Sequence, residues 1–517
     1  MHTPQWLKNA VFYNIYPQSF CDTNEDGIGD LNGVTSKLDY IASLGCNAIW
    51  LNPIYVSPFR DGGYDVTDFY KVAPRYGTND DFVTLAAEAK KRGIRVVLDL
   101  VAGHTSLECE WFQESAKPEK NDYSNRYIWS NSVWDTDGGQ LISGYSDRDG
   151  CYMKNFFYCQ PALNYGFKTI TQPWQLPMVH PDCLATREAL LDIMRFWSRL
   201  GADGFRVDLA SSLVKNDPTG EGVIELWNDL TERYYTEFPD HVLIAEWCHP
   251  KNAIQAGFHI DFLIHSGLKA YTTLFRYESG TNATETWLGD SYFRRAGKGN
   301  AREFLDEYLD HYHATKDRGY ISVPTGNHDI PRIAYGRDME ELKVAYAFIL
   351  TLPGVPFLYY GDEIGMRYVE GLPSKEGGYN RTGARTPMQW TDGKNFGFSS
   401  ADSLYLPTDP SCDAPTVTAQ ESDPNSLLNF TRKLLALRHE HPALSADASF
   451  EVLADGYPLA YRRTAEGETV CVAVNPSDKA YALTLPNPDT VLLSHGVKFE
   501  EDTAQFGALS YIVYTTK

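Results

Sequence analysis

The sequence lacks a long hydrophobic run, an excess of positive charge and a regular spacing of cysteines. No apolar stretch approaches the roughly 20 residues that a membrane-spanning helix needs. The formal net charge is −22 at pH 7, and a negative surface repels nucleic acids and anionic lipids. We therefore expect neither a membrane nor a nucleic acid as a partner. A soluble protein with a small, uncharged substrate fits this composition.

The chain also lacks the marks of a secreted protein. Its first residues contain no basic segment followed by an apolar one, which argues against a signal peptide. The nine cysteines are odd in number and scattered, as expected for the reduced thiols of a cytoplasmic protein. In that compartment the glycosylation acceptor triplet at 282–284 is a chance match.

What the sequence does contain is an alternation of short apolar segments with helical patterns. With 517 residues, the chain is long enough for two or three domains. Repeated βαβ units predict a parallel sheet, and eight of them predict a (β/α)8 TIM barrel of the α/β class. The predicted strands are 11–17, 47–53, 95–101, 204–208, 242–246, 259–263, 320–324 and 356–360. The predicted helices include 33–44, 82–92, 187–200, 223–238 and 427–438.

Two regions depart from this alternation. Residues 105–178 are rich in Tyr, Trp, Ser, Asn and Gly and follow no sustained period. A stretch of that length predicts an inserted subdomain after the third strand. Residues 442–517 alternate apolar and polar side chains between turns, which predicts a C-terminal all-β domain of the sandwich type. The barrel is then expected to comprise 1–104 and 179–441.

The segment Gly204-Phe205-Arg206-Val207-Asp208 is a predicted buried strand that ends in a carboxylate. Because strand side chains alternate, Arg206 and Asp208 point to the same side. A neighbouring cation lowers the pKa of a carboxyl group, so we expect Asp208 to be ionised and able to act as a nucleophile. The alternative for an isolated pair is a structural ion pair.

Other polar residues follow the ends of neighbouring predicted strands. Glu246 ends the fifth strand, and His328 and Asp329 follow the seventh. His104 follows the third strand, and Tyr64 and Asp65 follow the second. The C-terminal ends of barrel strands meet at one face, so these side chains should converge there. Paired carboxylates suit glycoside hydrolysis, in which one attacks the anomeric carbon and the other protonates the leaving oxygen.

The loop from Asp22 to Asp30 carries oxygen side chains at alternate positions around Gly27. This pattern is typical of the start of a calcium loop, although the Glu expected at position twelve is replaced by Gly33. The alternative is a polar, glycine-rich loop without a metal. We expect one structural Ca²⁺, with Mg²⁺ as the other candidate. Its predicted ligands are Asp22, Asn24, Asp26, Asp30 and the carbonyl of Ile28.

Four of these segments resemble, in order, the motifs of the α-amylase superfamily, glycoside hydrolase family 13. They are Asp99 to His104, Gly204 to Asp208, Ile244-Ala245-Glu246 and Asn327-His328-Asp329. The resemblance implies that Asp208 is the nucleophile, Glu246 the general acid/base and Asp329 the residue that stabilises the transition state. It also implies that His104, Arg206 and His328 help to bind the sugar.

Further segments resemble the oligo-1,6-glucosidase and α-glucosidase branch of that family. They are the Asp22 to Asp30 loop, Gln160-Pro161-Ala162-Leu163-Asn164 and Arg385-Thr386-Pro387-Met388-Gln389-Trp390. The resemblance implies that Asp65 and Arg385 clamp the terminal glucose and that Tyr64 and Phe156 line the same subsite.

The chain departs from the family pattern at three positions. Gly103 replaces an Asn that helps to hold a second calcium ion in α-amylases, so that ion is not expected. Ala162 replaces the usual Asp of its phrase. Leu209, directly after the nucleophile, does not decide between α-1,4 and α-1,6 linkages.

The resemblance implies a retaining, exo-acting α-glucosidase that hydrolyses short oligosaccharides or disaccharides. The alternative is a transglucosylase or isomerase on the same scaffold, such as a trehalose synthase or a sucrose isomerase. A non-catalytic partner protein, such as the heavy chain of an amino-acid transporter, would lack the catalytic carboxylates and carry a membrane span. The linkage and the oligomeric state stay open at this point.

Overall fold

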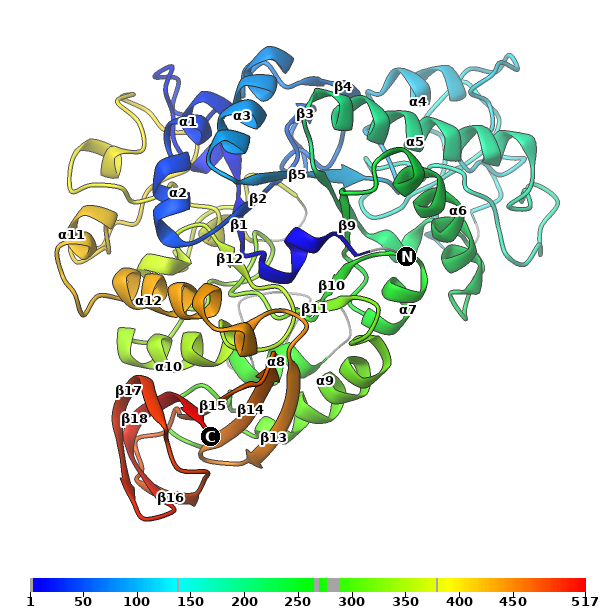
Figure 1. Cartoon of the computed structure of the whole chain (residues 1–517). Coiled ribbons are helices and arrows are strands. Elements are labelled where there is room, and N and C mark those ends of the chain that lie inside the picture. Colours follow the sequence, from blue (N-terminus) through cyan, green and yellow to red (C-terminus); the bar gives the residue numbers. More distant parts are fainter. Residues whose placement is uncertain (1–2, 137–138, 265–268, 277–288, 378–379) are drawn as a thin grey trace.

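A ring of eight parallel strands organises the chain in the computed structural model, which describes residues 3–136, 139–264, 269–276, 289–377 and 380–517 (Figure 1). The sheet runs in the order β11-β10-β9-β8-β5-β2-β1-β12. The N–H of Thr325 donates to the carbonyl of Phe357 at 3.0 Å, just after β11, and so links the two ends. The predicted barrel is confirmed. Its strands are β1 Phe12–Ile15, β2 Ala48–Leu51, β5 Arg95–Val101, β8 Gly204–Asp208, β9 Val242–Ala245, β10 Ile260–Phe262, β11 Tyr320–Ser322 and β12 Phe357–Tyr359.

The strand β8 can approach β9 closely because it begins with a glycine. Gly204 has φ +150°, and a Cβ atom at this position would lie 2.0 Å from the carbonyl oxygen of Val242. Any other residue would push the two strands apart. Gly204 pairs with Val242 and Val207 with Ala245, so this register places Asp208 and Glu246 side by side at the strand ends.

Helices surround the ring (Figure 1). The predicted helix 33–44 is two helices that break at Lys37, and the four helices between β9 and β12 had been predicted only as parts of βα units, without residue ranges. The helices of the barrel part are α1 Leu31–Ser36, α2 Leu38–Leu44, α3 Asn79–Lys91, α5 Pro181–Leu200, α6 Glu221–Glu237, α7 Pro250–Gln255, α8 Lys269–Phe275, α9 Ala301–Thr315, α10 Met339–Ile349, α11 Val417–Glu421 and α12 Leu427–Glu440. Among the described residues, no helix is both long and apolar enough to cross a membrane.

The chain between β5 and α5 forms the predicted insertion, drawn in cyan to teal in Figure 1. It contains α4 Glu110–Ser115 and the two short strands β6 Leu141–Ile142 and β7 Tyr152–Met153, which pair with each other. Aromatic rings form its interior, since Phe112 contacts Tyr127, Trp129 and Tyr152 at centroid distances of 5.1, 5.6 and 5.2 Å. A second small pair, β3 Tyr55–Val56 with β4 Asp68–Val72, follows β2.

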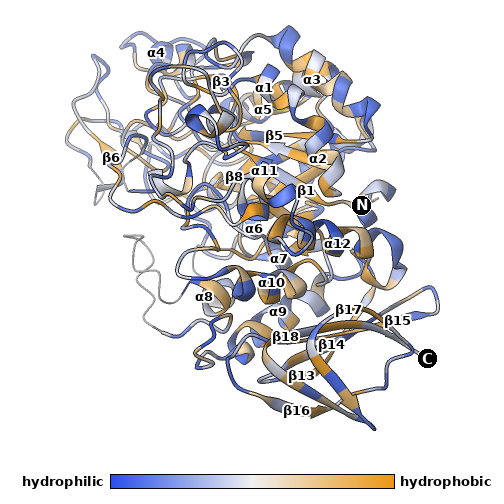
Figure 2. Cartoon of the chain, turned by 90° about the vertical axis from the view of Figure 1, so that its left-hand side faces the viewer, coloured by the Kyte–Doolittle hydropathy of each residue, from blue (hydrophilic) through white to orange (hydrophobic). Residues whose placement is uncertain are grey.

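The C-terminal part is an antiparallel sheet below α9 and α10 (Figure 2). All six strands are hydrogen-bonded into one sheet, because the long strand β18 pairs with β15, β16 and β17. One face belongs to the main hydrophobic core through Tyr461 and Val472, while the other buries Cys471 and Phe506 in a cluster of its own. The strands are β13 Ser449–Asp455, β14 Leu459–Ala465, β15 Glu468–Asn475, β16 Tyr481–Thr484, β17 Thr490–Glu500 and β18 Thr503–Thr516.

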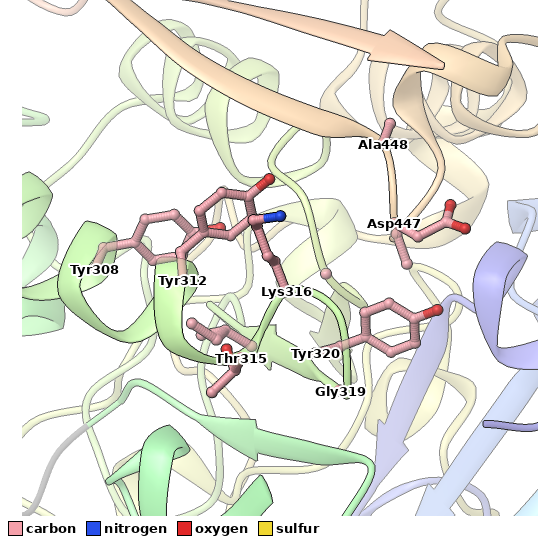
Figure 3. Close-up of a pocket in the computed structure, with 11 residues that line it drawn as sticks. Tyr308, Tyr312, Thr315, Lys316, Gly319, Tyr320, Asp447 and Ala448 are labelled. Carbon is pink, nitrogen blue, oxygen red and sulfur yellow. The ribbon is translucent and has the colours of Figure 1, made fainter. Parts of the chain in front are cut away.

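One buried arginine, Arg463, joins this sheet to the barrel, and a second, Arg438, binds α12 to the chain after α10. Arg463 donates to the carbonyls of Thr351 at 2.8 Å and Ala448 at 3.2 Å, and also to those of Ser445 and Ser449. Arg438 donates to the carbonyls of Leu350, Leu352 and Gly354. A small cavity at this junction, lined by Tyr308, Tyr312 and Tyr320, measures about 10 Å³ (Figure 3). That volume suffices for no more than one water molecule.

Candidate active site

One buried guanidinium binds three carboxylates at the C-terminal end of the barrel. Arg206 is 1% exposed. Its Nη1 lies 2.8 Å from Asp99 Oδ1 and 3.1 Å from Asp208 Oδ1, and its Nη2 lies 2.8 Å from Glu246 Oε1. The three acids come from β5, β8 and the residue after β9, so the predicted convergence occurs. The side chains of Asp208 and Glu246 are neighbours because both contact the same planar group.

The backbone beside Asp208 also holds Glu246. The N–H of Leu209 donates to Glu246 Oε2 at 2.9 Å. Leu209 has left-handed backbone angles, φ 43° and ψ 45°, which a non-glycine residue adopts only at a cost of about 1–3 kcal/mol. This strained residue therefore ties the general acid/base candidate to the residue that follows the nucleophile candidate.

The pKa values of Asp208 and Asp99 lie above those of exposed carboxyl groups. Burial raises the pKa of Asp208, and the nearby Glu246 raises it further, whereas Arg206 lowers it. Burial likewise raises the pKa of Asp99 to about 6. The expectation that Arg206 leaves Asp208 with a lowered pKa is therefore wrong, because one cation serves three buried acids.

Asp329 lies in a second network of buried arginines. Its Oδ1 accepts a hydrogen bond from Arg385 Nη2 at 3.2 Å and another from Arg381 Nη1. The other end of Arg381 forms an ion pair with Asp61, and Gln160 Nε2 donates to Asp61 Oδ2 at 2.6 Å. Arg381 thus bridges Asp61 and Asp329.

The clamp on the terminal glucose by Asp65 and Arg385 stays a prediction, and the structure holds the Asp65 carboxylate within its own loop. Asp65 is 0% exposed, and its carboxylate accepts from Ser57 Oγ and from the N–H groups of Arg60 and Asp61. Burial raises its pKa to about 6. The Asp65 carboxylate therefore stabilises its own loop. Asp61, four residues earlier, forms the ion pair with Arg381. The sequence signal for Asp61 was its place beside Tyr64 in the same polar loop.

Arg385 is itself held in place by groups that the motifs did not reveal. Its Nη1 contacts Glu376 Oε2 at 3.1 Å, and its Nε donates to the carbonyl of His328 at 2.9 Å. Glu376 accepts from Tyr16 Oη at 2.6 Å and from Gln18 Nε2 at 2.9 Å. Arg385 is 1% exposed. These contacts hold the guanidinium of Arg385 in the position from which it binds the Asp329 carboxylate.

His328 is stacked between two tyrosine rings. Its ring lies 5.2 Å from that of Tyr64 and 6.0 Å from that of Tyr16, with interplanar angles of 9° and 10°. Burial lowers its pKa well below the ordinary value, so the ring is neutral. Asn52 Nδ2 donates to His328 Nδ1 at 3.0 Å, which leaves the proton on Nε2, 3.2 Å from Asp329 Oδ2. Tyr64 Oη in turn donates to Asp99 Oδ2 at 2.8 Å, so this stack connects the two networks.

His104 and Phe156 lie where the insertion meets the barrel. His104 Nε2 faces the carbonyl of Tyr64 at 3.1 Å and its Nδ1 faces Asn155 Nδ2 at 3.1 Å. Burial lowers the pKa of His104 to about 3, so it too is neutral. Phe156 is 42% exposed and its ring lies 4.4 Å from that of Phe157.

The ammonium group of Lys215 lies near Gly103. Gly103 replaces the Asn that helps to hold a second calcium ion in α-amylases, so that ion was not expected here. A Cβ atom at Gly103 would lie 2.7 Å from Asn155 Nδ2. Lys215 Nζ donates to Asn155 Oδ1 at 2.8 Å and to the carbonyl of Ser212. A protein cation thus occupies this junction, and burial lowers the pKa of Lys215 to about 8.

The predicted calcium loop is folded by its own carboxylates. Asp22 Oδ1 accepts from the N–H groups of Asn24 and Glu25 at 3.0 and 2.9 Å, and its Oδ2 accepts from Gly27 N at 2.8 Å. Asn24 Oδ1 accepts from Asp26 N and Asp26 Oδ1 from Ile28 N. Asp30 caps α1 through Gly33 N at 2.7 Å. Within the described part of the chain, no three carboxylate, imidazole or thiol groups converge as a metal site, so the ion stays a prediction. All nine cysteines have free thiols.

Known proteins resemble this chain along most of its length. The family model described as "Alpha amylase, catalytic domain" matches residues 14–447. Trehalose synthase/amylase TreS of Mycolicibacterium smegmatis is 37% identical over 505 residues, which cover 89% of this chain and 80% of that protein. Oligo-1,6-glucosidase of Parageobacillus thermoglucosidasius is 31% identical over 541 residues, which cover 93% of this chain and 92% of that protein. The crystal structure of the trehalulose synthase MutB from Pseudomonas mesoacidophila covers 100% of both chains with a TM-score of 0.82 and 26% identity.

Proposed function

Because the chain belongs to the α-amylase family, glycoside hydrolase family 13, we propose that it is a retaining, exo-acting α-glucosidase that hydrolyses short oligosaccharides or disaccharides. The observation that carries this proposal is the single guanidinium of Arg206, which contacts both Asp208 and Glu246. In retaining glycosidases the two carboxyl groups are roughly 5–5.5 Å apart, and a shared guanidinium keeps two carboxylates close.

The first chemical step uses the two acids in different protonation states. The Asp208 carboxylate attacks the anomeric carbon while the bond to the leaving oxygen breaks, and Glu246 gives that oxygen its proton. The product is a β-linked glucosyl ester of Asp208. Asp329, oriented by Arg385 and His328, would bind hydroxyl groups of the distorted ring in the transition state.

The second step regenerates the enzyme. Glu246, now ionised, takes a proton from a water molecule, whose oxygen attacks the anomeric carbon and releases Asp208. Two inversions give an α-configured product. The bridge of Asp61, Arg381 and Asp329 supports exo action, because it sets charged hydrogen-bonding groups around one end of the site, where a terminal glucose would be held.

Glucosyl transfer to another sugar is the second candidate, and the similarity to trehalose synthase/amylase TreS favours it. A solved structure of a MutB variant holds the substrate sucrose, which fits a small disaccharide as substrate. Chemically the change is limited to the second step, in which a sugar hydroxyl takes the place of water. The networks around Asp208 and Asp329 serve both reactions.

One experiment tests the proposal and separates the two candidates. Maltose, isomaltose, sucrose and trehalose are each incubated with the enzyme and followed by time-resolved NMR. We expect free α-glucose as the first product from at least one of them. β-Glucose as the first product would overturn the retaining mechanism. A new disaccharide without free glucose would replace hydrolysis by transfer as the main activity.

A further inference from the structure

A groove outside the catalytic carboxylates lies between the N-terminal end of α10, the segment after β12 and the loop at 409–411. Its volume is about 900 Å³. Ligand pockets in proteins measure roughly 300–1,000 Å³, so the groove has room for a sugar of several units. The side chains that matter for its chemistry are Tyr335, Arg337, Arg367, Tyr368, Glu370 and Asp409.

Two half-buried tyrosines give the groove an aromatic surface. The rings of Tyr335 and Tyr368 are 5.9 Å apart and nearly perpendicular, with an interplanar angle of 88°. Tyr335 Oη donates to Glu370 Oε1 at 2.5 Å, which fixes its orientation. A ring that is held in this way offers an apolar face with a polar edge, and the C–H face and hydroxyl groups of a pyranose match that combination.

Three arginines line the groove, Arg294, Arg337 and Arg367, and the guanidinium groups of Arg337 and Arg367 are already engaged. Arg367 forms a bidentate ion pair with Asp413, with both N···O distances 2.8 Å. Arg337 donates to the carbonyls of Phe275, Phe293 and Ile333. Since strong recognition of an anion needs such donors, an anionic ligand has little to gain here.

The acceptors in the groove are less occupied than the donors. Asp409 is 5% exposed, and its Oδ1 accepts from Ser411 N at 2.9 Å. Its Oδ2 has no hydrogen-bond partner among the described residues, and a buried polar atom without a partner costs free energy. Glu370 is exposed. Asp409 therefore forms part of the wall, and the exposed carboxylate of Glu370 next to the aromatic rings favours an uncharged ligand that is rich in hydroxyl groups.

The groove shares a wall with the catalytic arginines. A Cβ atom at Gly383 would lie 3.0 Å from the ring of Tyr368, and the N–H of Val369 donates to the carbonyl of Gly383 at 3.2 Å. Gly383 stands between Arg381 and Arg385, and both of these contact Asp329. A ligand in the groove would therefore press on the segment that orients Asp329.

We infer that this groove is a second saccharide-binding site, which takes a neutral α-glucan oligosaccharide outside the catalytic pocket. The choice of ligand rests on the proposed function, whereas the site itself rests on the groove's own side chains. The probe is maltotriose, added to the full-length wild-type enzyme whose catalytic pocket is filled by saturating 1-deoxynojirimycin, an iminosugar. Saturation-transfer NMR and calorimetry report binding.

We expect maltotriose to bind with a Kd of about 1 mM while the pocket is filled. Tyr335→Ala should weaken this binding by about tenfold or more and leave hydrolysis of an aryl α-glucoside unchanged. Tyr335→Phe is the matched control, because it keeps the ring and loses only the hydroxyl group. It should retain most of the affinity.

Three outcomes decide the inference. No maltotriose binding with the pocket filled overturns it, and so does binding that Tyr335→Ala leaves intact in a variant with a normal melting curve. If the enzyme hydrolyses no glucoside at all, the proposed function fails. The groove is then still tested by comparing Tyr335→Ala with Tyr335→Phe, because maltotriose binding lost only in the alanine variant supports the site.

Discussion

At the scale of the residue, Arg206 contacts three carboxyl groups that have different roles in the proposed reaction. Burying a charge is costly unless it is paired, and one guanidinium cannot fully neutralise Asp99, Asp208 and Glu246. Burial therefore raises the pKa of Asp208 and of Asp99, although Arg206 lowers both. Asp99, which begins the first motif but received no role there, is a positioning residue for this cluster through its contacts with Arg206 and Tyr64.

Asp99→Asn should move the acid side of the pH profile of kcat/KM to lower pH. The negative charge of Asp99 raises the pKa of Asp208, and a raised pKa means that the carboxylate is lost at a higher pH as pH falls. Removing that charge lowers the pKa of Asp208 and keeps it ionised in more acidic solution. The variant should also lose about one to two powers of ten in kcat, because Tyr64 and Arg206 lose an anchor.

The control is Asp192→Asn, which changes a carboxylate of α5 that is 56% exposed and pairs with Arg195. Its pH profile should match that of the wild type. An acid limb of Asp99→Asn that stays in place or moves to higher pH would contradict the shared-charge account.

Asp208→Asn should remove nearly all activity while the fold persists, since no group is left to form the glucosyl ester. Loss of a nucleophile typically costs several powers of ten in kcat. Residual activity above about a tenth of the wild-type kcat, measured on the substrate identified by the NMR panel, would remove Asp208 from this role.

Glu246→Gln should discriminate between leaving groups. Natural glucosides need a proton on the departing oxygen and should react slowly, whereas an aryl α-glucoside with an acidic phenol needs none in the first step. Azide should accelerate the second step and yield an α-glucosyl azide, because it needs no general base and attacks the β-linked ester with inversion. Equal losses on both substrates, without azide rescue, would argue against Glu246 as acid/base.

The motif residues converge as predicted because they end parallel strands, and neighbouring strand ends are close in any barrel. Asp61, Arg381 and Glu376 could not be found in this way, since they belong to loops whose paths depend on distant contacts. Glu376 meets Tyr16 and Gln18 about 360 positions away. The resemblance pointed to Asp65, whereas the pairing of Asp61 with Arg381 depends on the folded path of two distant loops.

At the scale of the element, the Asp22 to Asp30 loop is the feature most open to test. We propose that it binds one Ca²⁺ as a structural ion, with Mg²⁺ as the alternative, through the oxygens of Asp22, Asn24, Asp26, Asp30 and Ile28. The exposed Asp26 has one oxygen engaged with Ile28 N. Ion binding to the folded state alone stabilises it by about 2.7 kcal/mol at 100 times Kd, so Tm should rise with Ca²⁺ and fall with EDTA.

Asp26→Ala should abolish that Ca²⁺ dependence, while Asp402→Ala, at an exposed position that pairs with Lys394, should preserve it. A Tm that is the same in Ca²⁺ and EDTA, together with metal-free purified protein, would show a loop held only by its internal hydrogen bonds.

The strands were easier to predict than the helices. Every barrel strand is a short apolar run that is buried on both sides, and such runs stand out in a sequence. The helix α7, which had no predicted residue range, is only six residues long, too short for a periodic pattern. The break at Lys37 follows from local backbone angles of φ −106° and ψ 7°, which no side-chain pattern encodes.

At the scale of the whole molecule, Arg463 holds the C-terminal sheet against the barrel, and its guanidinium binds backbone carbonyls. Arg463→Met would remove the guanidinium that donates to the carbonyls of Thr351, Ser445 and Ala448. The expected loss is on the order of 3 kcal/mol in the free energy of unfolding, measured by urea denaturation, with the kcat of the folded enzyme unchanged. Arg462→Met, at a neighbouring side chain that is 44% exposed and pairs with Glu451, should cost less than about 0.5 kcal/mol. Equal losses in the two variants would show that the junction gains nothing from Arg463.

The sandwich of His328 between Tyr16 and Tyr64 has a spectroscopic consequence. Protons above the face of an aromatic ring are shielded by its ring current, and the imidazole of His328 has such a face on both sides. Its carbon-bound protons should therefore resonate far upfield of those of the other histidines among the 13 in the chain. Because His328 also contacts Asp329, these lines would report occupancy of the sugar pocket in the unlabelled enzyme, without a chromogenic substrate.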